Sequence, residues 1–290
     1  MNFFNLFGQR ERYMIEASFA NYAYATHSVS QKMDIYLPPN KGEANVILNV
    51  HGGGWCTGDK MVYADGCKNA AKTGYTAASM NYRMLKPLIY LPLWIQPMHC
   101  KDMLDDIGNA IAALNAKLIV EGYTPKKLAI TGSSAGGHLV MLYGYSRYQQ
   151  SSILIAFLAT DCAPTDLTDT ASYSNLRKKS AVALLSALAG RKISSQDVLN
   201  KNPALKALSP LYSVDSGAPA TLGRYGAQDK IIPLSQGTAM QAALNTVNVR
   251  NDLFVYPNTG HTLYKPAPSD GGISDAYMAK LQEYITVLFT

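Results

Sequence analysis

The chain of 290 residues has few of the features that mark disulfide-rich, metal-binding or membrane-spanning proteins. It contains four cysteines, none of them in a C-x-x-C pair, which argues against a zinc site and a dense disulfide framework. No apolar run reaches the roughly 20 residues that a transmembrane helix needs. Internal repeats and low-complexity tracts are also missing. We therefore expect a globular protein with free, mostly buried thiols, although one or two disulfides remain compatible with the spacing.

A concentrated positive charge is missing as well. The 26 Lys and Arg residues exceed the 20 Asp and Glu residues, but they are scattered, and no basic helix or aromatic-interleaved patch occurs. This argues against a nucleic-acid partner. The first residues, Met1–Arg12, lack a basic n-region, a long apolar h-region and a small-residue cleavage site. They predict a cytoplasmic protein, or a secreted or periplasmic one if a signal peptide has been removed.

Apolar periodicity divides the chain into alternating strands and helices. Short apolar runs such as Val46–Val50 and Leu128–Thr131 predict strands buried on both faces. This alternation indicates one α/β domain, residues 1–290, with a mostly parallel sheet covered by helices on both faces. An insertion at residues 161–219 interrupts the pattern, and we expect it to shape the pocket together with the N-terminal segment 1–30. Further strands are predicted within Tyr22–Leu37 and at Tyr75–Met80, Ile153–Ala159, Ala220–Tyr225 and Asp252–Tyr256, and helices at Tyr63–Lys72, His99–Leu118, Gly137–Tyr145, Ala181–Leu188, Ser235–Leu244 and Ser274–Leu288.

Three carboxylates, Asp102, Asp105 and Asp106, lie near the start of the helix predicted at His99–Leu118. The partial positive charge at a helix N-terminus favours acidic side chains there. We therefore interpret all three as solvated structural residues and not as catalytic ones.

The pentapeptide Gly132–Gly136 reads G-x-S-x-G and directly follows the predicted strand Leu128–Thr131. This pattern requires a strained strand-to-helix turn that presents Ser134 as a nucleophile. Small residues on both sides of the serine are needed because side chains there would collide with the neighbouring strand and helix. An isolated match is equally typical of an ordinary glycine-rich turn, so the assignment depends on finding a base, an acid and an oxyanion hole.

A second glycine motif, His51-Gly52-Gly53-Gly54-Trp55, follows the strand Val46–Val50. Consecutive glycines let backbone amides approach a developing negative charge. Acyl-transfer hydrolases pair such a loop with a downstream G-x-S-x-G turn. We predict that the amides of Gly53, Gly54 and Ala135 form the oxyanion hole, with the amide of Trp55 as a substitute. His51 is expected to hold the loop by hydrogen bonds.

Only five histidines compete for the role of the base. His261 lies in a loop after the last predicted strand, from which it can reach the carboxyl edge of the sheet. His27 and His99 precede the serine turn and lie outside any loop at the expected strand ends. His138 is four residues beyond Ser134 and is expected to pack or bond locally. His261 is therefore the predicted base.

Three aspartates compete for the role of the acid. Asp229 follows the strand Ala220–Tyr225, and the adjoining Ile231-Ile232-Pro233 can dock its loop against the sheet. A carboxylate there can accept the imidazole N–H and stabilise the imidazolium that forms. Asp161 follows the preceding strand, and Asp166 lies further out. We favour Asp229, which gives the chain order Ser134, Asp229, His261 that is found in α/β-hydrolases.

Together these blocks resemble the α/β-hydrolase esterase/lipase family with the HGGG oxyanion motif, which is related to hormone-sensitive lipase. The chain is most similar to the feruloyl- and acetyl-esterase-like branch, which includes relatives of kynurenine formamidase. Two segments depart from that pattern: Tyr225-Gly226 replaces a common His-Gly, and Met84–Pro87 lacks the acidic-proline segment of the lipase branch. The matching blocks are His51–Trp55, Gly58–Lys60, Asn81–Arg83, Gly132–Leu139, Tyr225–Asp229 and Gly260-His261.

The resemblance implies a catalytic triad of Ser134, Asp229 and His261, no metal or other cofactor, and a small-molecule carboxylic ester as the substrate. Short-chain or aromatic esters of the acetyl or feruloyl type are expected. Two alternatives stay open: an amidase or formamidase with the same triad, and a non-catalytic ligand-binding homologue.

Overall fold

The computed structural model describes residues 14–86, 98–170 and 178–290, so the segment used to predict localisation and Pro87 of the Met84–Pro87 departure lie outside the described residues. The strands form one eight-stranded sheet in the order β1-β2-β4-β3-β5-β6-β7-β8. β2 pairs antiparallel with β1 and β4, and every other pair is parallel, which confirms the mostly parallel sheet. The strands are β1 (Ala17–Ala23), β2 (Lys32–Leu37), β3 (Gly42–Val50), β4 (Thr76–Met80), β5 (Tyr123–Ser133), β6 (Leu154–Asp161), β7 (Ala220–Gly226) and β8 (Asn251–Tyr256).

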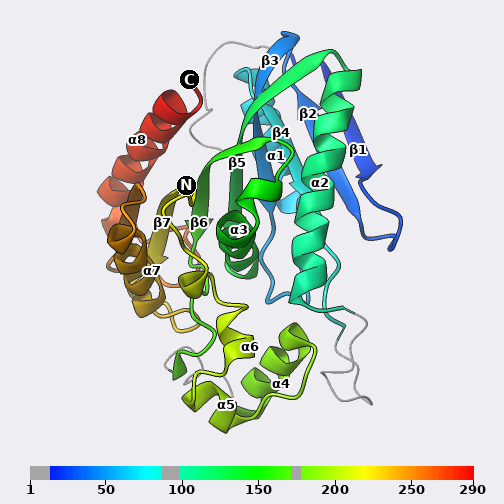
Figure 1. The fold of residues 1–290 in the computed structure, drawn as a ribbon. Helices are drawn as coiled ribbons and strands as arrows, with labels where there is room; N and C mark the ends of the chain where they lie inside the picture. The colour runs from blue at the N-terminus through cyan, green and yellow to red at the C-terminus, as the bar shows by residue number, and fades with distance from the viewer. Residues whose placement is uncertain (1–13, 87–97, 171–177) are drawn as a thin grey trace.

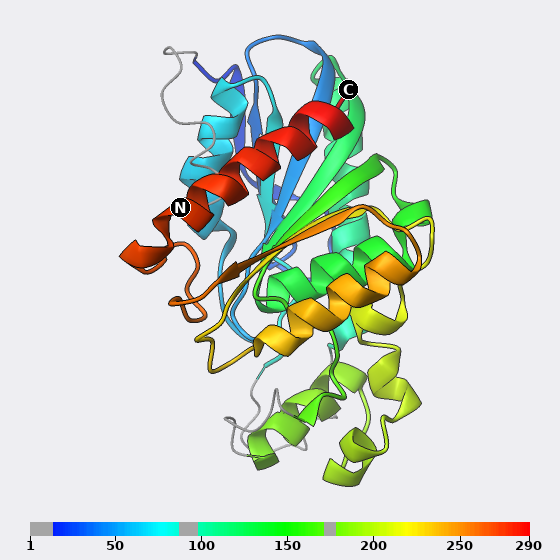
Figure 2. The same ribbon diagram turned by 90° about the vertical axis from the view of Figure 1, so that its left-hand side faces the viewer.

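Helices cover both faces of the sheet, as the alternating pattern predicts. Successive side chains of β3 point to opposite faces: Val46 and Leu48 join the core under α2, α3 and α7, whereas Ile47 joins the core under α1 and α8. Figure 2 shows α8 running across the strands on one of the two faces of the sheet. The helices are α1 (Ala64–Lys72), α2 (Cys100–Val120), α3 (Ala135–Ser146), α7 (Leu234–Thr246) and α8 (Gly271–Leu288), with short 3-10 helices η2 (Lys60–Tyr63), η3 (Tyr148–Gln150), η5 (Pro210–Tyr212) and η6 (Pro268–Asp270).

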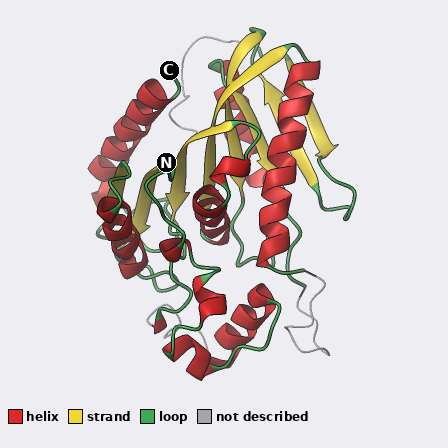
Figure 3. Cartoon of the chain, in the orientation of Figure 1, coloured by secondary structure: helices red, strands yellow, loops and turns green. Residues whose placement is uncertain are grey.

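The insertion lies beyond the carboxyl edge of the sheet. Its helices α4 (Lys178–Ala189), α5 (Ser195–Leu199) and α6 (Pro203–Lys206) gather at one end of the molecule (Figure 1). The central strands point toward them (Figure 3). The loops that leave β3, β5, β7 and β8 therefore emerge on the side of the insertion, where ligands bind in open α/β sheets.

One of the three carboxylates near the start of α2 departs from expectation. Asp106 is fully buried, so the prediction that it is solvated is wrong. Its two oxygens accept from Arg83 Nε at 2.9 and 3.0 Å, and its Oδ1 accepts from Gln31 Nε2 at 2.7 Å. A buried carboxylate is tolerated only with such donors. Asp102 has a structural role, because its carboxylate accepts from the amide of His99 at 2.8 Å and caps α2.

The four cysteines are all free, and three of them are buried, as predicted. Among the described helices, none combines the length and the apolar composition that crossing a bilayer requires.

Candidate active site

The predicted nucleophile lies in a sharp turn between β5 and α3. Ser134 has φ 54° and ψ −122°, a conformation that costs a non-glycine residue energy and occurs mostly where the surroundings enforce it. A Cβ on Gly132 would lie 2.6 Å from the carbonyl carbon of Gly136, and a Cβ on Gly136 would lie 2.2 Å from the Val50 oxygen. The amide of Ser134 donates to the Asp161 carbonyl at 2.7 Å. The turn is therefore clamped between the ends of β3 and β6, and the flanking glycines are steric necessities.

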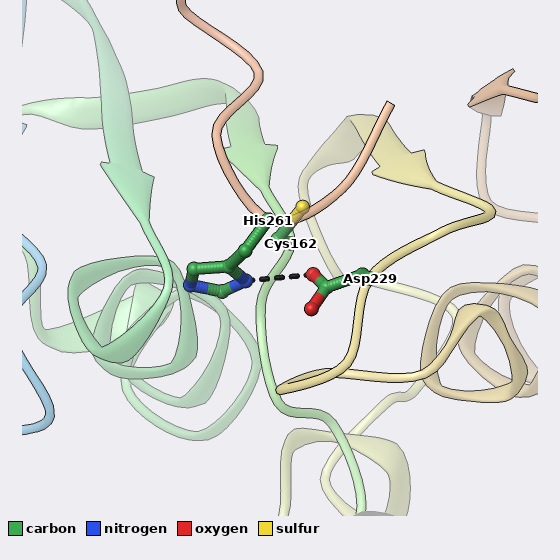
Figure 4. A group of neighbouring side chains, drawn as sticks. All are labelled: Cys162, Asp229 and His261. Atoms are coloured by element: carbon green, nitrogen blue, oxygen red, sulfur yellow. Dashed lines mark hydrogen bonds and ion pairs between the residues drawn. The ribbon is translucent and has the colours of Figure 1, made fainter. Parts of the chain in front are cut away.

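The predicted base and acid are in direct contact. His261 Nδ1 lies 2.6 Å from Asp229 Oδ2, and the carboxylate faces that nitrogen while the other ring nitrogen points away from it (Figure 4). Asp229 Oδ1 accepts from the amides of Ile231 at 2.7 Å and Ile232 at 2.9 Å. Burial alone would raise the pKa of the Asp229 carboxyl, but the hydrogen bonds from His261 and the two amides lower it below its ordinary value. Asp229 is therefore an ionised acceptor that orients the imidazole.

In the part of the chain that the structure describes, neither rival carboxylate is hydrogen-bonded to the imidazole. Asp161 forms a bidentate ion pair with the buried Arg224, with Nε–Oδ1 and Nη2–Oδ2 distances of 2.5 and 2.7 Å. Asp166 accepts from the amide and hydroxyl of Thr168 and from the hydroxyl of Tyr212. Both carboxylates thus have structural partners, which leaves Asp229 as the candidate acid.

The serine turn and the acid–base pair meet across the end of β6. Ser134 is bonded to Asp161 through its amide, and the next residue, Cys162, has its Sγ within 4.8 Å of the nearest polar atoms of Asp229 and His261. Among the residues that the structure describes, Ser134 Oγ forms no hydrogen bond with His261. Such bonds are commonly long without substrate and tighten in the reacting complex. The end of β6 therefore touches both the serine turn, through Asp161, and the acid–base pair, through Cys162.

Cys162, Asp229 and His261 also form a group of three potential metal ligands. The carboxylate and Nδ1 already bond to each other, and burial raises the pKa of the Cys162 thiol, which keeps it protonated. A metal requires the thiolate and the free Nδ1 lone pair. The arrangement therefore fits an acid–base pair better than a metal centre.

The predicted oxyanion loop has an unusual backbone. Gly53, Gly54 and Trp55 all have positive φ, at 112°, 60° and 61°, and the Gly53 carbonyl accepts from the amides of Cys56 and Thr57. Within the described ranges, the N–H groups of Gly53, Gly54 and Ala135 have no acceptor. Ala135 opens α3, so its N–H has no partner inside the helix. Unpaired N–H groups of this kind are what an oxyanion hole requires.

His51 anchors the start of this loop, as predicted. Its Nδ1 donates to the Gly52 carbonyl at 2.7 Å, its ring stacks on Tyr82 with centroids 4.5 Å apart, and the Tyr82 hydroxyl donates to the His51 carbonyl. Burial lowers the pKa of the His51 imidazole, so the ring is neutral. His51 is a structural residue of the loop.

A network of polar side chains bonds the end of the oxyanion loop to β2 and to the residue that follows β4. This network was not predicted from the sequence. The Asn81 side chain accepts from the amide of Lys60 at 2.6 Å and donates to Asp59 at 2.8 Å. The Lys60 ammonium, almost fully buried, lies 2.8 Å from Asp34 Oδ2. The only sequence signal was the presence of Gly58–Lys60 and Asn81–Arg83 among the family blocks.

The family model of BD-FAE matches residues 33–244, more than half of the chain. The chain belongs to the BD-FAE family. LipM of Mycobacterium tuberculosis, described as a probable carboxylic ester hydrolase, is 26% identical over an alignment of 244 residues that covers 80% of this chain and 52% of LipM. The chain spans between half and three fifths of the length of LipM and of a second curated relative that it matches, esterase LipQ of the same organism.

Solved structures show the same fold at low identity. A truncated carbohydrate esterase from gut microbiota has a TM-score of 0.69 and 20% identity, covering 95% of this chain and 97% of that one. An inhibited esterase B from Lactobacillus rhamnosis has a TM-score of 0.70 and 18% identity, covering 96% and 90%. These similarities confirm the α/β-hydrolase fold.

The BD-FAE match includes Ser134 and Asp229 but ends before His261. The assignment of His261 therefore rests on its contact with Asp229. The family departure at Tyr225 affects packing, because this buried tyrosine donates its hydroxyl to the Ala163 carbonyl at 2.6 Å.

His138 of this BD-FAE chain is fully buried and packs against Trp55, which agrees with the packing alternative, but the hydrogen bonds of its ring are not local. Its Nδ1 accepts from Trp55 Nε1 at 3.2 Å, and its Nε2 donates to the Leu208 carbonyl at 2.7 Å. Because an indole N–H only donates and a carbonyl only accepts, one neutral tautomer satisfies both partners. Burial lowers the pKa of His138 to about 4, in agreement with a neutral ring.

Buried neutral His138 is expected to make stability depend on pH. Its pKa is about 4 in the fold and about 6.5 in the unfolded chain, so the unfolded state takes up the proton first as the pH falls. The contribution of the neutral His138 ring to the free energy of unfolding is therefore fully present above pH 6.5. As the pH falls to 4, roughly 3 kcal/mol of that free energy is lost. Urea unfolding at pH 7 and pH 4.5 should show a smaller loss for His138→Asn than for the wild type. Equal losses would contradict a neutral buried ring.

Proposed function

We propose that the chain is a serine carboxylesterase that hydrolyses short-chain or aromatic carboxylic esters through an acyl-enzyme. The observation that carries the proposal is the bonded Asp229–His261 pair beside the strained turn that presents Ser134. A serine hydroxyl becomes an effective nucleophile only next to a base that is itself oriented by a third group. The carbohydrate esterase and the esterase B that share the fold, and the ester hydrolase LipM, support the same reaction class.

The reaction begins when His261 Nε2 takes the proton of Ser134 Oγ as the oxygen attacks the ester carbonyl carbon. The carbonyl oxygen becomes an oxyanion that the amides of Gly53, Gly54 and Ala135 stabilise. The C–O bond to the alcohol then breaks, and His261 gives its proton to the leaving oxygen. Water, deprotonated by His261, attacks the acyl-enzyme, releases the acid and restores the Ser134 hydroxyl. Asp229 stays ionised throughout and stabilises the imidazolium.

The ester assignment competes with an amidase or formamidase that uses the same residues. Parallel assays with p-nitrophenyl acetate and an N-formyl aryl amine separate the two, because the same acyl-transfer steps release either an alcohol or an amine. A kcat/KM at least tenfold higher for the ester supports the esterase. Preferential hydrolysis of the formyl amine identifies a formamidase, and turnover of neither substrate favours a ligand-binding homologue.

Two exposed apolar side chains support an aromatic or apolar alcohol group. Ile231 is 48% exposed and follows Asp229 by two residues, and Tyr264 is 66% exposed and follows His261 by three. The leaving oxygen receives its proton from His261, so the alcohol group departs on the side of these loops. Exposed apolar side chains on the loops that carry the acid and the base suit an apolar ligand better than a charged one.

Tyr264→Ala is expected to raise the KM for p-nitrophenyl acetate by about 2- to 10-fold, the range of a single aromatic contact. The KM for ethyl acetate, which has no aryl group, should change less than twofold. The matched control is Leu154→Ala, because Leu154 is 65% exposed but begins β6 at the opposite edge of the sheet. Steady-state kinetics with both esters test the assignment, and equal changes in the two KM values would refute the aryl contact.

A further inference from the structure

Trp55 is held in a conformation that its side chain does not favour. Its φ of 61° is in the left-handed region, where a residue with a bulky side chain is strained, and it directly follows the oxyanion glycines. Two bonds hold it: its carbonyl accepts from the amide of Leu85 at 2.9 Å, and its indole N–H donates to His138 Nδ1 at 3.2 Å. The two rings meet edge to face with centroids 5.2 Å apart. The position of the loop therefore depends on the position of the His138 ring.

The other ring nitrogen of His138 is bonded to the insertion. Nε2 donates to the Leu208 carbonyl at 2.7 Å, between α6 and η5. This part of the insertion is itself tied to the chain that follows β6, because Ser209 Oγ accepts from the amide of Leu167 and the amide of Leu211 donates to the Thr165 carbonyl. The His138 side chain has no solvent exposure, so water cannot replace either bond without opening the core.

We propose that His138 is a positioning residue that braces the oxyanion loop against the insertion, so that the amides of Gly53 and Gly54 keep their place only while both of its ring bonds are made. An imidazole is a rigid spacer, and its two nitrogens reach in fixed directions from one ring. A shift of the Leu208 carbonyl therefore tilts the ring and moves the Trp55 indole. The brace acts on the oxyanion hole and rests on the proposed function.

Three conservative variants each remove one of the two ring bonds of His138. Trp55→Phe keeps an aromatic ring but removes the indole N–H. His138→Asn keeps an acceptor near the Nδ1 position but is too short to reach Leu208, whereas His138→Gln reaches Leu208 but lacks the acceptor for Trp55. Each variant is expected to lower kcat for p-nitrophenyl acetate by about 10- to 100-fold, because displaced catalytic groups cost that much. KM should stay within about twofold, since the oxyanion donors act in the transition state.

The brace also predicts non-additive effects. Trp55→Phe should lower kcat by less than about twofold in either His138 variant, because the connection is already cut there. Undiminished kcat in His138→Asn would overturn the link to the insertion, and full additivity would overturn the brace. Thermal unfolding is the control for folding: a variant that loses stability while its kcat at 25 °C is unchanged assigns His138 a purely structural role and refutes the proposal.

Hydrogen–deuterium exchange separates failure of the brace from failure of the proposed function. Exchange of the backbone amides of Cys56 and Thr57, which donate to the Gly53 carbonyl, should be faster in Trp55→Phe and His138→Asn than in the wild type, whether or not an ester is hydrolysed. Unchanged exchange refutes the brace. Absence of wild-type turnover together with faster exchange in the variants refutes the esterase assignment and keeps the brace.

Discussion

Replacing Ser134 with alanine is expected to lower kcat for p-nitrophenyl acetate by at least about a thousandfold, with the fold intact. The reason is that the proposed reaction needs an oxygen on this side chain to form the acyl-enzyme, and no other group in the turn has the strained backbone that presents it. Alanine removes one oxygen atom and keeps the Cβ, so the glycine packing around the turn is unchanged. The measurement is steady-state kinetics with circular dichroism of the same sample.

The neighbouring Ser133 supplies the matched control. It lies in the same turn and is the last residue of β5, but its backbone has no positive φ. A fluorophosphonate probe should add one adduct to the wild type and to Ser133→Ala, and none to Ser134→Ala, as measured by intact mass. Labelling of Ser134→Ala, or turnover close to the wild-type rate, would remove Ser134 from the mechanism.

The serine turn was predictable because its requirements are local and steric. A tight strand-to-helix turn around a serine needs glycines such as Gly132 and Gly136, and their crowded Cβ positions in the structure have that cause. Asp229 and His261 were predictable for a related reason. Parallel strands bring their carboxyl ends to one edge, so residues 32 positions apart meet once the strand order is known.

Other features depend on contacts that leave no local signal. Asp106 has the helix-start position of a solvated carboxylate, yet Gln31, 75 residues earlier in the chain, helps to bury it. His138 follows the serine by four residues, but its partners Trp55 and Leu208 lie 83 and 70 residues away. Helix propensity and motif spacing describe one helix or strand at a time. The roles of Asp106 and His138 depend instead on segments that are far apart in the sequence and come together only in the fold.

Asp229→Asn is expected to lower kcat on the order of 10³- to 10⁴-fold with little change in the fold. The contacts of Asp229 explain why so small a change has this effect. Oδ1 accepts from the amides of Ile231 and Ile232, so an asparagine places its carbonyl oxygen there. Its NH₂ group then faces His261 Nδ1, which must accept, and the ring proton moves to Nε2. In that tautomer His261 has no lone pair for the proton of Ser134.

Asp166→Asn is the control, because Asp166 was the outlying rival for the acid and an asparagine oxygen at the Oδ1 position keeps the bonds from Thr168, while its NH₂ group can donate to the Tyr212 hydroxyl. Its kcat should stay within about threefold of the wild type. Fluorophosphonate labelling distinguishes a changed His261 tautomer from a misfolded protein. A folded Asp229→Asn protein should label more slowly than the wild type but still only at Ser134, since the nucleophile is intact and only its activation is impaired. A labelling rate equal to that of the wild type would show that Asp229 does not set the tautomer of His261, and the acid would have to be sought elsewhere.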